Sequence, residues 1–427
     1  MKQAEMLVLG IDIGTSGVRT AVLDQDGTLV STARAAHLPT SNEDANAWWD
    51  AAARAVQAQV SALHETQHNP HEIERIAIDG TSGSMVLVDA TLNPVTAAMM
   101  YNSGGFDREA ERIASHAEPG SITLGPSSAL ARMLRLQAMD ESGSAVHLLH
   151  QADYVLAKLA GMSLGSDDNN ALKLGWDPAV GDWPSWFETA GVPVETLPNV
   201  HRPGAEIGEL SHAVADALGL AAGTKLHAGT TDSIAAFLAS GATEIGDAVT
   251  SLGTTLAIKL LSDARVDDPA SGVYSHLVNG KWLAGGASNT GGGVLAHHFS
   301  GQQLADLSAR IDPDVASQLH YYPLLKAGER FPVNEPQLEP KLEPRPLDDA
   351  EFLKGMLEAM ARIEKQGYDA LHRLGAPSPK RLFTAGGGAK NAIWSAIRAR
   401  HVDAQMVEPR HSEAAVGAAQ LCLLGSG

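Results

Sequence analysis

The sequence predicts an α/β protein of two domains. Short apolar runs of strand length alternate with helical periodicities along the chain. A strand–turn–strand unit occurs twice, and the length of 427 residues exceeds one ordinary core. We therefore expect an N-terminal domain of residues 1–224 and a C-terminal domain of residues 225–427.

The first three strands are predicted to form a meander. Turn signals at Gly14-Thr15-Ser16 and Asp24-Gln25-Asp26-Gly27 separate short apolar runs. The expected strands are Leu7–Asp12, Val18–Leu23 and Thr28–Ala33.

A helix and a further strand follow in the first domain. Apolar residues recur at helical spacing over residues 44–68, where Asn69-Pro70 ends the pattern. Ile73–Ile78 is typical of a buried strand, and Met85–Asp89 is expected to continue it as a hairpin. Residues 127–159 are predicted to be mainly helical and residues 165–203 mainly irregular.

The second domain repeats the opening pattern. A strand at Lys225–Ala228 leads to a helix at Ile234–Ala239. Gly253-Thr254-Thr255 then separates strands at Ala248–Leu252 and Leu256–Leu261, as Gly14-Thr15-Ser16 does in the first domain. The sequence identity between the two units is slight, but the pattern is what two copies of one unit would give.

The end of the chain contains a loop, a long helix and a glycine-rich turn. Proline and charged residues over 331–346 predict an exposed loop. A helix over residues 348–374 and a strand at Arg381–Thr384 follow. Ala385–Ala389, where the strand ends, holds three consecutive glycines.

The composition limits the possible partners. A formal net charge of −19 argues against nucleic acid, although backbone N–H groups and Mg²⁺ can hold a nucleotide in an acidic protein. No apolar run is long enough for a bilayer, Met1–Met6 does not resemble a signal peptide, and the single cysteine, Cys422, suits a reducing compartment. We expect a cytoplasmic protein, monomer or homodimer, that acts on a small molecule without a nucleic-acid or membrane partner.

Asp12-Ile13-Gly14-Thr15-Ser16 is a carboxylate followed by a tight turn between two expected strands. Successive N–H groups near Gly14 can form a nest for phosphate, Thr15 adds a hydroxyl, and Asp12 could hold a hydrated Mg²⁺. The same residue types are common in ordinary hairpin turns. The motif alone leaves both interpretations open.

Asp232, within Gly229-Thr230-Thr231-Asp232-Ser233, lies where a strand is expected to meet a helix. As a helix cap it would contribute about 1 kcal/mol. As a general base it would contribute about 10²–10⁴ in rate. The two roles can coexist.

Two glycine-rich turns mark the second domain. Gly253-Thr254-Thr255 has the composition of the first phosphate turn. Ala385–Asn391 carries Gly386, Gly387 and Gly388, beside Lys390 and Asn391, and permits a base or phosphate to lie against bare backbone. A flexible connector is the alternative.

In their order and spacing these motifs resemble the sugar-kinase, Hsp70 and actin ATPase superfamily, and within it the FGGY carbohydrate kinases, over Gly10–Gly417. The resemblance implies two actin-like (RNase H-like) ATPase domains with a central cleft, and MgATP as phosphate donor. It implies that Asp12 and Thr15 act on the transferred phosphate, with Asp12 also near Mg²⁺ and sugar, and that Asp232 is the catalytic base. The nucleotide-binding residues that it implies are Gly14, Thr15, Ser16, Gly253, Thr254, Gly386, Gly387, Gly388 and Asn391.

The choice of sugar depends on the loop 79–84 and on Lys173. Xylulose kinases usually have Met-His in this loop, whereas Thr81-Ser82-Gly83-Ser84 is closer to ribulose kinases. Lys173-Leu174-Gly175-Trp176 resembles a Lys-x-x-Trp feature of L-ribulose kinases, with a surface lysine as the alternative. Tyr101–Gly105 lacks a charged patch that family members often have. The pattern as a whole resembles the D-ribulose kinases of photosynthetic organisms, with Ser82 and Lys173 as sugar contacts and D-xylulose as the alternative substrate.

Several other functions are disfavoured. His64–His68 fits the zinc-protease pattern HExxH but stands at a polar helix end before Pro70. The sequence contains neither GxxxxGK[ST] nor a GxGxxG after a strand, so a P-loop or dinucleotide fold is not indicated. A sugar-independent ATPase of the same superfamily remains the rival class, although no spare segment for peptide or polymer contacts is evident.

Overall fold

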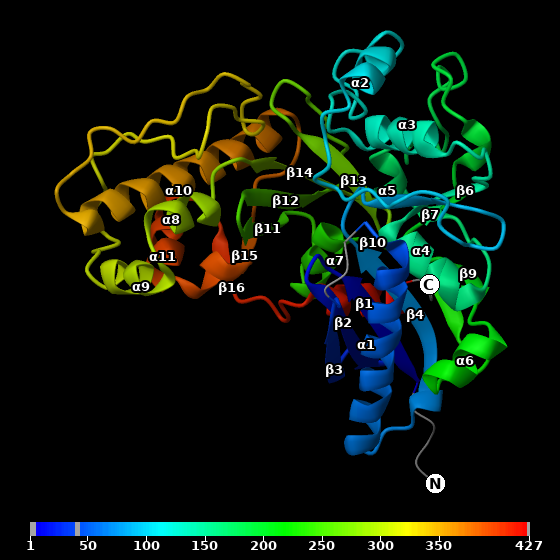
Figure 1. Ribbon diagram of the computed structural model, residues 1–427. Coiled ribbons are helices and arrows are strands. Elements are labelled where there is room, and N and C mark those ends of the chain that lie inside the picture. Colours follow the sequence, from blue (N-terminus) through cyan, green and yellow to red (C-terminus); the bar gives the residue numbers. More distant parts are fainter. Residues whose placement is uncertain (1–5, 39–42, 425–427) are drawn as a thin grey trace. The chain divides into compact units, whose positions relative to one another are not determined.

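The computed structural model describes residues 6–38 and 43–424, and the chain forms two compact α/β units. Unit 1 comprises Met1–Ala239 and Glu413–Gly427, and unit 2 comprises Ser240–Ser412. Each contains one six-stranded mixed sheet (Figure 1). Of the segment Met1–Met6, only Met6 belongs to the described residues. Over the described ranges, none of the helices is both long and apolar enough to cross a bilayer.

The sheet of unit 1 has the order β3-β2-β1-β4-β10-β9. Its strands are β3 (Leu29–Ala36), β2 (Gly17–Asp24), β1 (Leu7–Ile13), β4 (Ile73–Gly80), β10 (Lys225–Thr231) and β9 (Glu206–Glu209). The pairs β1–β2 and β2–β3 are antiparallel, which confirms the predicted meander. The pairs β1–β4 and β4–β10 are parallel, so these three strands end at one edge of the sheet.

The sheet of unit 2 has the order β13-β14-β12-β11-β15-β16. Its strands are β13 (Tyr274–Val278), β14 (Lys281–Ser288), β12 (Leu256–Ser262), β11 (Asp247–Leu252), β15 (Arg381–Ala385) and β16 (Gln405–Val407). The pairs β11–β12 and β12–β14 are antiparallel, and β11–β15 and β15–β16 are parallel.

The two sheets share the arrangement of their central strands. In both, the first strand pairs with an antiparallel second strand on one side and with a later, parallel strand on the other, β4 in unit 1 and β15 in unit 2. The turn Gly14–Ser16 joins strands one and two in unit 1, and Gly253–Thr255 joins them in unit 2. The duplication suggested by the two strand–turn–strand units is thus visible in the fold.

Helices cover the sheet of unit 1. They are α1 (Ala45–Glu65), α4 (Gln151–Ala160), α6 (His212–Leu218), α7 (Asp232–Ala239) and α12 (Ala414–Leu424). The Asp44 side chain caps α1 by accepting from the Asn46 N–H, and α1 buries Trp48, Val56 and Leu63. Helix α12 packs closely on β1, because a Cβ at Gly10 would lie 1.9 Å from the Ala415 carbonyl oxygen.

Smaller elements complete unit 1. These are β5 (Met85–Val88), α2 (Asp107–Ala114), α3 (Ala129–Met139), β6 (His147–His150), β7 (Ser166–Asp167), α5 (Asp168–Leu172) and β8 (Val200–His201), with 3₁₀ turns η1 (Pro70–Glu72) and η2 (Val194–Thr196). The hairpin expected from Ile73–Ile78 to Met85–Asp89 is not formed: β5 pairs with β6 in a separate two-stranded sheet. A single apolar run cannot reveal a partner strand that lies far along the chain.

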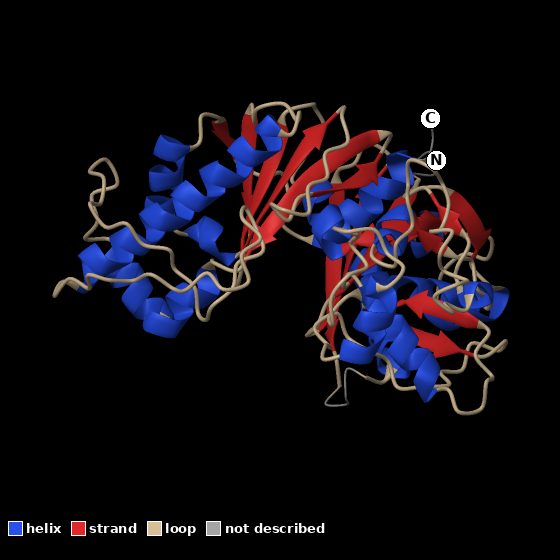
Figure 2. Ribbon diagram, turned by 90° about the horizontal axis from the view of Figure 1, so that it is seen from above, coloured by secondary structure: helices blue, strands red, loops and turns tan. Residues whose placement is uncertain are grey.

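The helices of unit 2 lie on one side of its sheet (Figures 1 and 2). They are α8 (Gly292–His298), α9 (Gly301–Ser308), α10 (Asp349–Arg373) and α11 (Ala392–His401), with a 3₁₀ turn η3 (Gly387–Lys390). The long helix predicted over 348–374 is confirmed as α10, and Asp348 caps it by accepting from the Ala350 N–H.

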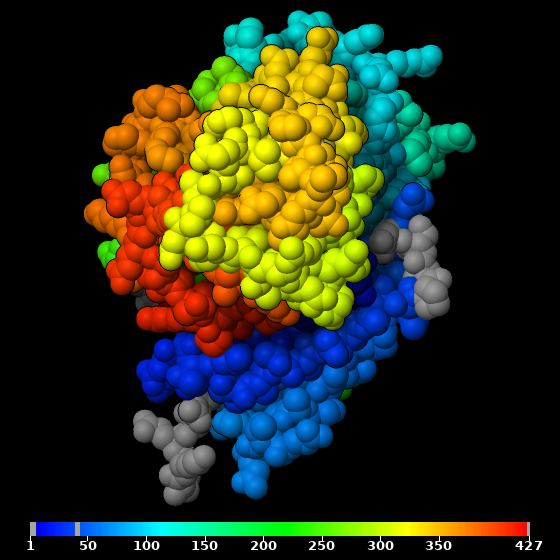
Figure 3. All heavy atoms as spheres, turned by 90° about the vertical axis from the view of Figure 1, so that its left-hand side faces the viewer, coloured from blue at the N-terminus to red at the C-terminus, as the bar shows by residue number. Residues whose placement is uncertain are grey.

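The segment 309–348 between α9 and α10 contains no helix or strand and covers part of the surface of unit 2, yellow to orange in Figure 3. This agrees with the exposed loop predicted over residues 331–346, except at its first two residues, Phe331 and Pro332, which are buried. Phe331 is fully buried, because its ring occupies the space left by Gly286 and Gly367.

The units divide after Ala239 rather than at the expected boundary of 224/225. The reason is that β10 pairs with β4 within the sheet of unit 1. The chain also returns to unit 1 at Glu413, and α12 completes that unit. Hydrophobic periodicity does not show which sheet a strand joins.

Candidate active site

The turns and loops that follow β1, β4 and β10 lie at one edge of the unit 1 sheet, since these strands are parallel. After β1 comes the turn Gly14–Ser16, after β4 the loop Thr81–Ser84, and after β10 the first residue of α7, Asp232. The Gly14 N–H donates to the Gly17 carbonyl at 3.0 Å, which closes the first turn. Thr15 and Ser16 are exposed there.

Asp12 is the buried carboxyl at the end of β1. It is 5% exposed and accepts from Arg19 Nη1 at 3.0 Å. Burial raises the pKa of Asp12, while Arg19 opposes that shift. A buried carboxyl paired with one cation is thus held at the end of β1, beside the turn.

Asp79 is a second carboxyl beside Asp12. The two residues are register partners in the parallel pair β1–β4. Asp79 is fully buried, and neither of its oxygens has a hydrogen-bond donor among the described residues. Burial raises the pKa of Asp79 well above its ordinary range, and the charges of Asp12 and Asp232 raise it further. A buried carboxyl between two others is favoured in its neutral form, in which it can share its proton with Asp12.

Asp232 opens α7. It is partly exposed, and its Oδ1 accepts from the Ser233 N–H at 2.6 Å. The charge of Asp232 reaches Asp79, so three carboxyl groups gather at this edge of the sheet. The sequence predicted separate roles for Asp12 and Asp232, and in the structure both carboxyls interact with a third, Asp79.

Hydroxyl groups line the loop after β4. The Thr81 N–H and hydroxyl both donate to Gln151 Oε1, at 3.0 and 2.8 Å, and the hydroxyls of Thr81 and Ser84 lie 2.6 Å apart. Thr81 and Ser84 are therefore engaged within the protein. The Ser82 Oγ is buried without a partner among the described residues. The Ser82 hydroxyl thus differs from those of Thr81 and Ser84, which bond within the protein.

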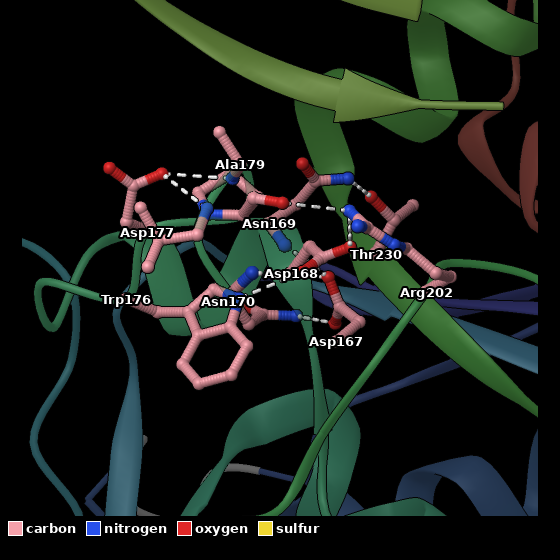
Figure 4. A network of polar contacts seen from close by, with 11 residues as sticks. Asp167, Asp168, Asn169, Asn170, Trp176, Asp177, Ala179, Arg202 and Thr230 are labelled. Atoms are coloured by element: carbon pink, nitrogen blue, oxygen red, sulfur yellow. Dashed lines mark hydrogen bonds and ion pairs between the residues drawn. The ribbon is translucent and has the colours of Figure 1, made fainter. Parts of the chain in front are cut away.

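A polar network joins α5 to β10 (Figure 4). Asn169 Nδ2 donates to Thr230 Oγ1 at 2.9 Å, and Asn169 Oδ1 is buried without a partner among the described residues. Thr230 is the register partner of Asp79 on the adjacent strand, so this amide lies near the carboxyl cluster. Asp167 accepts from two N–H groups and from Asn170 Nδ2, and burial raises its pKa to about 6.

Lys173 and Trp176 have separate surroundings. Lys173 follows α5 directly as its C-terminal cap and is partly buried. Trp176 Nε1 donates to Asp168 Oδ1 at 2.8 Å, and Asp168 also pairs with Arg202 at 3.0 Å (Figure 4). Trp176 therefore belongs to the polar network, and its indole N–H is used within the protein.

Unit 2 contains a pocket of about 720 Å³ between its glycine turns and helices. Of the predicted nucleotide-binding residues, it is lined by Gly253, Thr254, Gly387, Gly388 and Asn391. The remaining wall is mostly apolar and includes Leu295, Ala296, Leu304, Ala305, Ile393 and Trp394. An apolar pocket with a few polar groups suits a planar heterocycle, since its flat faces gain from desolvation.

Gly386 and Asn391 shape this pocket. Gly386 does not line it; its φ of +85° and a Cβ that would lie 2.8 Å from the Leu252 carbonyl carbon make it a structural turn residue. Asn391 caps α11 by accepting from the Trp394 N–H, and its Nδ2 donates to Ser308 Oγ at 2.9 Å. The glycine run is thus ordered as η3 rather than a flexible connector.

Residues that sequence reasoning missed complete both sites. In unit 1 they are Asp79, Gln151, Asn169 and Thr230, and in unit 2 they are Gly292, Gly293, Ser308 and Trp394. Asp79 had a usable signal, because Ile78-Asp79-Gly80 repeats the apolar–Asp pattern of Ile11-Asp12 at a strand end. Thr230 and Trp394 lie near Asp232 and Asn391 in sequence, whereas Gln151, Asn169, Gly292, Gly293 and Ser308 come from elements distant in sequence, which local patterns do not show.

Two matches to known families cover nearly all of the chain. Residues 7–239 match the N-terminal domain, and residues 248–426 the C-terminal domain, of the FGGY family of carbohydrate kinases. The chain belongs to the FGGY family. It is accordingly an ATP-dependent carbohydrate kinase, and its two sheets are those of the two FGGY domains.

Similar proteins include several xylulose kinases. The xylulose kinase of Escherichia coli K12 is 24% identical, covering 98% of this chain and 90% of the relative. That of Streptomyces rubiginosus is 29% identical, covering 65% of this chain and 59% of the relative. The structure of a xylulose kinase from Rhodospirillum rubrum has a TM-score of 0.85 at 23% identity, covering 99% of this chain and 90% of the other.

These comparisons fix the family and do not single out the D-ribulose kinases, to which the loop 81–84 led us from sequence. As for HExxH, α1 ends at Glu65, so His68 lies beyond the helix and His64–His68 does not present two imidazoles on one helical face. In the described part of the chain, no group of three or more His, Cys, Asp or Glu residues is arranged to hold a metal ion.

Proposed function

We propose that this FGGY kinase transfers the γ-phosphate of MgATP to a primary hydroxyl of a ketopentose, with D-xylulose as the first candidate. The supporting observation is the cluster of Asp12, Asp79 and Asp232 beside a free Ser82 hydroxyl, in a chain that also carries an apolar pocket with glycine turns. The names of the relatives favour D-xylulose.

D-Ribulose is the second candidate, and a specific observation favours it. The loop reads Thr81-Ser82-Gly83-Ser84, whereas xylulose kinases usually have a Met-His pair at this place. The buried Ser82 hydroxyl stands where a Met-His pair would present a thioether and an imidazole. An unpaired buried polar group is costly, so this change alters which sugar hydroxyl can form a hydrogen bond here. The two sugars differ in the configuration of one hydroxyl group.

In the proposed reaction Asp232 acts as general base. Its carboxylate accepts the proton of the sugar hydroxyl while the oxygen forms a bond to the γ-phosphorus and the bond from phosphorus to the ADP oxygen breaks. Asp232 is partly exposed at the start of α7, where a substrate hydroxyl has access. In unit 1, the Thr15 hydroxyl and the N–H groups of Thr15 and Ser16 would contact the transferred phosphate, since the Gly14 N–H closes the turn.

Asp12 fits the role of Mg²⁺ ligand. Mg²⁺ keeps several waters and takes one or two carboxylates plus the substrate phosphates, so it does not need a site with three protein ligands. Asp12 is a single buried carboxyl next to an exposed turn, which suits such a partial site. When bound, the ion would neutralise charge on the phosphates.

The nucleotide would lie in unit 2. Gly253 and Thr254 would contact its phosphates, and Gly387, Gly388 and Asn391 its adenosine, with Gly386 holding the turn. Ser82 and Lys173 remain the proposed sugar contacts in unit 1.

The test is ADP release with MgATP against D-xylulose, D-ribulose, L-ribulose, glycerol and no sugar. Turnover that depends on a ketopentose supports the proposal, and the better of the two ketopentoses decides between the candidates. Full-rate hydrolysis without any sugar would refute it. Strong turnover with glycerol alone would retain the reaction but overturn the substrate class.

A further inference from the structure

Arg132 of α3 is a fully enclosed cation that binds only backbone. Its side chain is 2% exposed. Nη1 donates to the Gly83 carbonyl at 2.6 Å, and Nη2 donates to the carbonyls of Tyr101, Ser103 and Ser127 at 2.7, 3.1 and 3.0 Å. One guanidinium thereby joins three separate segments of unit 1.

The enclosed charge of Arg132 is balanced by backbone carbonyls rather than by a carboxylate. Among the described residues no carboxylate pairs with Arg132, and its Nε is buried without a partner. Burial lowers the pKa of Arg132 to about 10, which reflects the cost of an enclosed charge. The four carbonyls that Arg132 satisfies offset this cost, and an apolar side chain in its place would leave them without this donor.

The segments that Arg132 joins surround the proposed sugar loop. Gly83 directly follows Ser82, the residue with the unpartnered hydroxyl. The Tyr101 N–H donates to Ser84 Oγ at 3.0 Å, so the loop 81–84 and the segment 101–103 are held together twice. The segment Tyr101–Gly105 has no charged side chain of its own, and the charge at this place comes from α3.

We propose that Arg132 is a positioning residue for sugar recognition: it fixes the loop 81–84 against residues 101–103 so that the Ser82 hydroxyl is presented to the substrate. This proposal rests on the proposed function of that loop. Arg132 does not touch the sugar, because its guanidinium is enclosed by carbonyl groups. A rigid loop lowers the ordering that sugar binding would otherwise require.

The experiment compares Arg132→Met and Arg132→Lys with a matched control, Arg135→Met. Arg135 lies on the same helix, one turn further, and pairs at the surface with Glu109 of α2 at 2.7 Å. We expect Arg132→Met to raise the KM for the sugar roughly 10- to 100-fold, while the KM for ATP stays within about twofold. Lysine is expected to recover little, since its ammonium cannot reach carbonyls on both sides as the guanidinium fork does. The control leaves both constants unchanged.

Two further measurements keep the proposal testable if Arg132→Met folds poorly. Gly83 has φ +86°, and a Cβ there would lie 3.1 Å from Arg132 Nη1, so Gly83→Ala should raise the sugar KM in the same selective way. Hydrogen exchange of amides 81–84 and 101–105 should accelerate in Arg132→Lys but not in Arg135→Met.

The outcomes separate this inference from the proposed function. Equal loss toward sugar and ATP, or a lower melting temperature with unchanged constants, would show a purely structural role and overturn the proposal. Unchanged hydrogen exchange in both Arg132 variants would overturn it as well. If no sugar supports turnover in the wild type, the proposed function fails, whereas accelerated exchange confined to these loops would still show that Arg132 holds them.

Discussion

The two units share the arrangement of their central strands but differ in the side chains at corresponding turns. In unit 1 the strand ends carry three carboxyls, with Asp79 in electrostatic contact with both Asp12 and Asp232. In unit 2 the equivalent turn, Gly253–Thr255, borders a pocket whose wall is mostly apolar side chains and bare glycine backbone. The same arrangement of central strands thus carries a cluster of carboxyls in unit 1 and a mostly apolar pocket in unit 2.

This difference teaches that topology positions a turn, while the side chains beside it decide its use. Each sheet places the turn between its first two strands at the end of a parallel strand pair. In unit 1 burial and like charges shift carboxyl pKa values, which are adjustments that catalysis requires. In unit 2 the glycines that line the pocket leave room for a ligand, because they have no side chain. The predictions below test this division.

The largest effect is expected at Asp232. Replacing it with alanine removes the proposed base, and sugar phosphorylation should fall about 10²–10⁴-fold. Binding of ATP should remain, because the pocket lies in unit 2. The measurements are ketopentose-dependent ADP release and nucleotide affinity by calorimetry. A folded variant that loses nucleotide binding would contradict the division between the units.

The next effect concerns the glycines of η3. A Cβ at Gly388 would lie 2.6 Å from the Trp394 ring and 2.7 Å from Leu252 Cβ, so Gly388→Ala should destabilise unit 2 by about 1–3 kcal/mol and weaken ATP binding. A Cβ at Gly387 would have no other heavy atom within 4 Å, so Gly387→Ala should change stability by less than about 0.5 kcal/mol. Because Gly387 lines the pocket, the added methyl group should still weaken ATP binding.

Melting temperatures and KM values for ATP and sugar distinguish these two glycine variants. The sugar KM should stay constant in both. A rise in sugar KM alone would break the assignment of the nucleotide to unit 2.

A smaller, pH-dependent effect is expected at Asp79. Its folded-state pKa is raised, so its contribution to stability is complete below the unfolded pKa of about 3.9 and is lost as the pH rises through the folded pKa. Asp79→Asn stays neutral at every pH. The stability of this variant relative to wild type should therefore increase with pH, as measured by denaturant unfolding over a pH series. A difference that is constant with pH would mean that Asp79 is not held in its neutral form.

The smallest effect is expected at His64. Because His68 lies beyond the end of α1, the pair does not form a helical zinc site, and His64→Gln should leave activity and stability within error. Activity after dialysis against a zinc-specific chelator in excess Mg²⁺ provides the same check. Loss of activity in either experiment would give the HExxH sequence a role that we do not assign to it.

Much of the fold was predictable because its signals are local. The apolar runs around Gly14–Ser16 and Gly253–Thr255 gave both meander starts, and Asp44 and Asp348 stand where α1 and α10 begin. The partner of β5 and the unit of β10 were not predictable, since strand pairing depends on residues far apart in the chain.

The site was predictable to the same extent. Asp12 and Asp232 follow strands directly and so were found, and Gly387 and Gly388 were found as a glycine run. Arg132 could not be found, because a lone arginine in a helical pattern gives no sign of the four carbonyls that it will bind. Gln151 and Asn169 likewise gain their meaning only from contacts with Thr81 and Thr230.

The return of the chain to unit 1 at Glu413 affects the order in which the protein can assemble. Unit 2 is contiguous in sequence, whereas unit 1 acquires α12 only after every residue of unit 2. During synthesis, unit 2 can fold while β1 still exposes the face around Gly10 that α12 later covers. The sheet that carries Asp12 and Asp79 is then covered by α12 last, so in a nascent chain the pocket of unit 2 can form before unit 1 is complete.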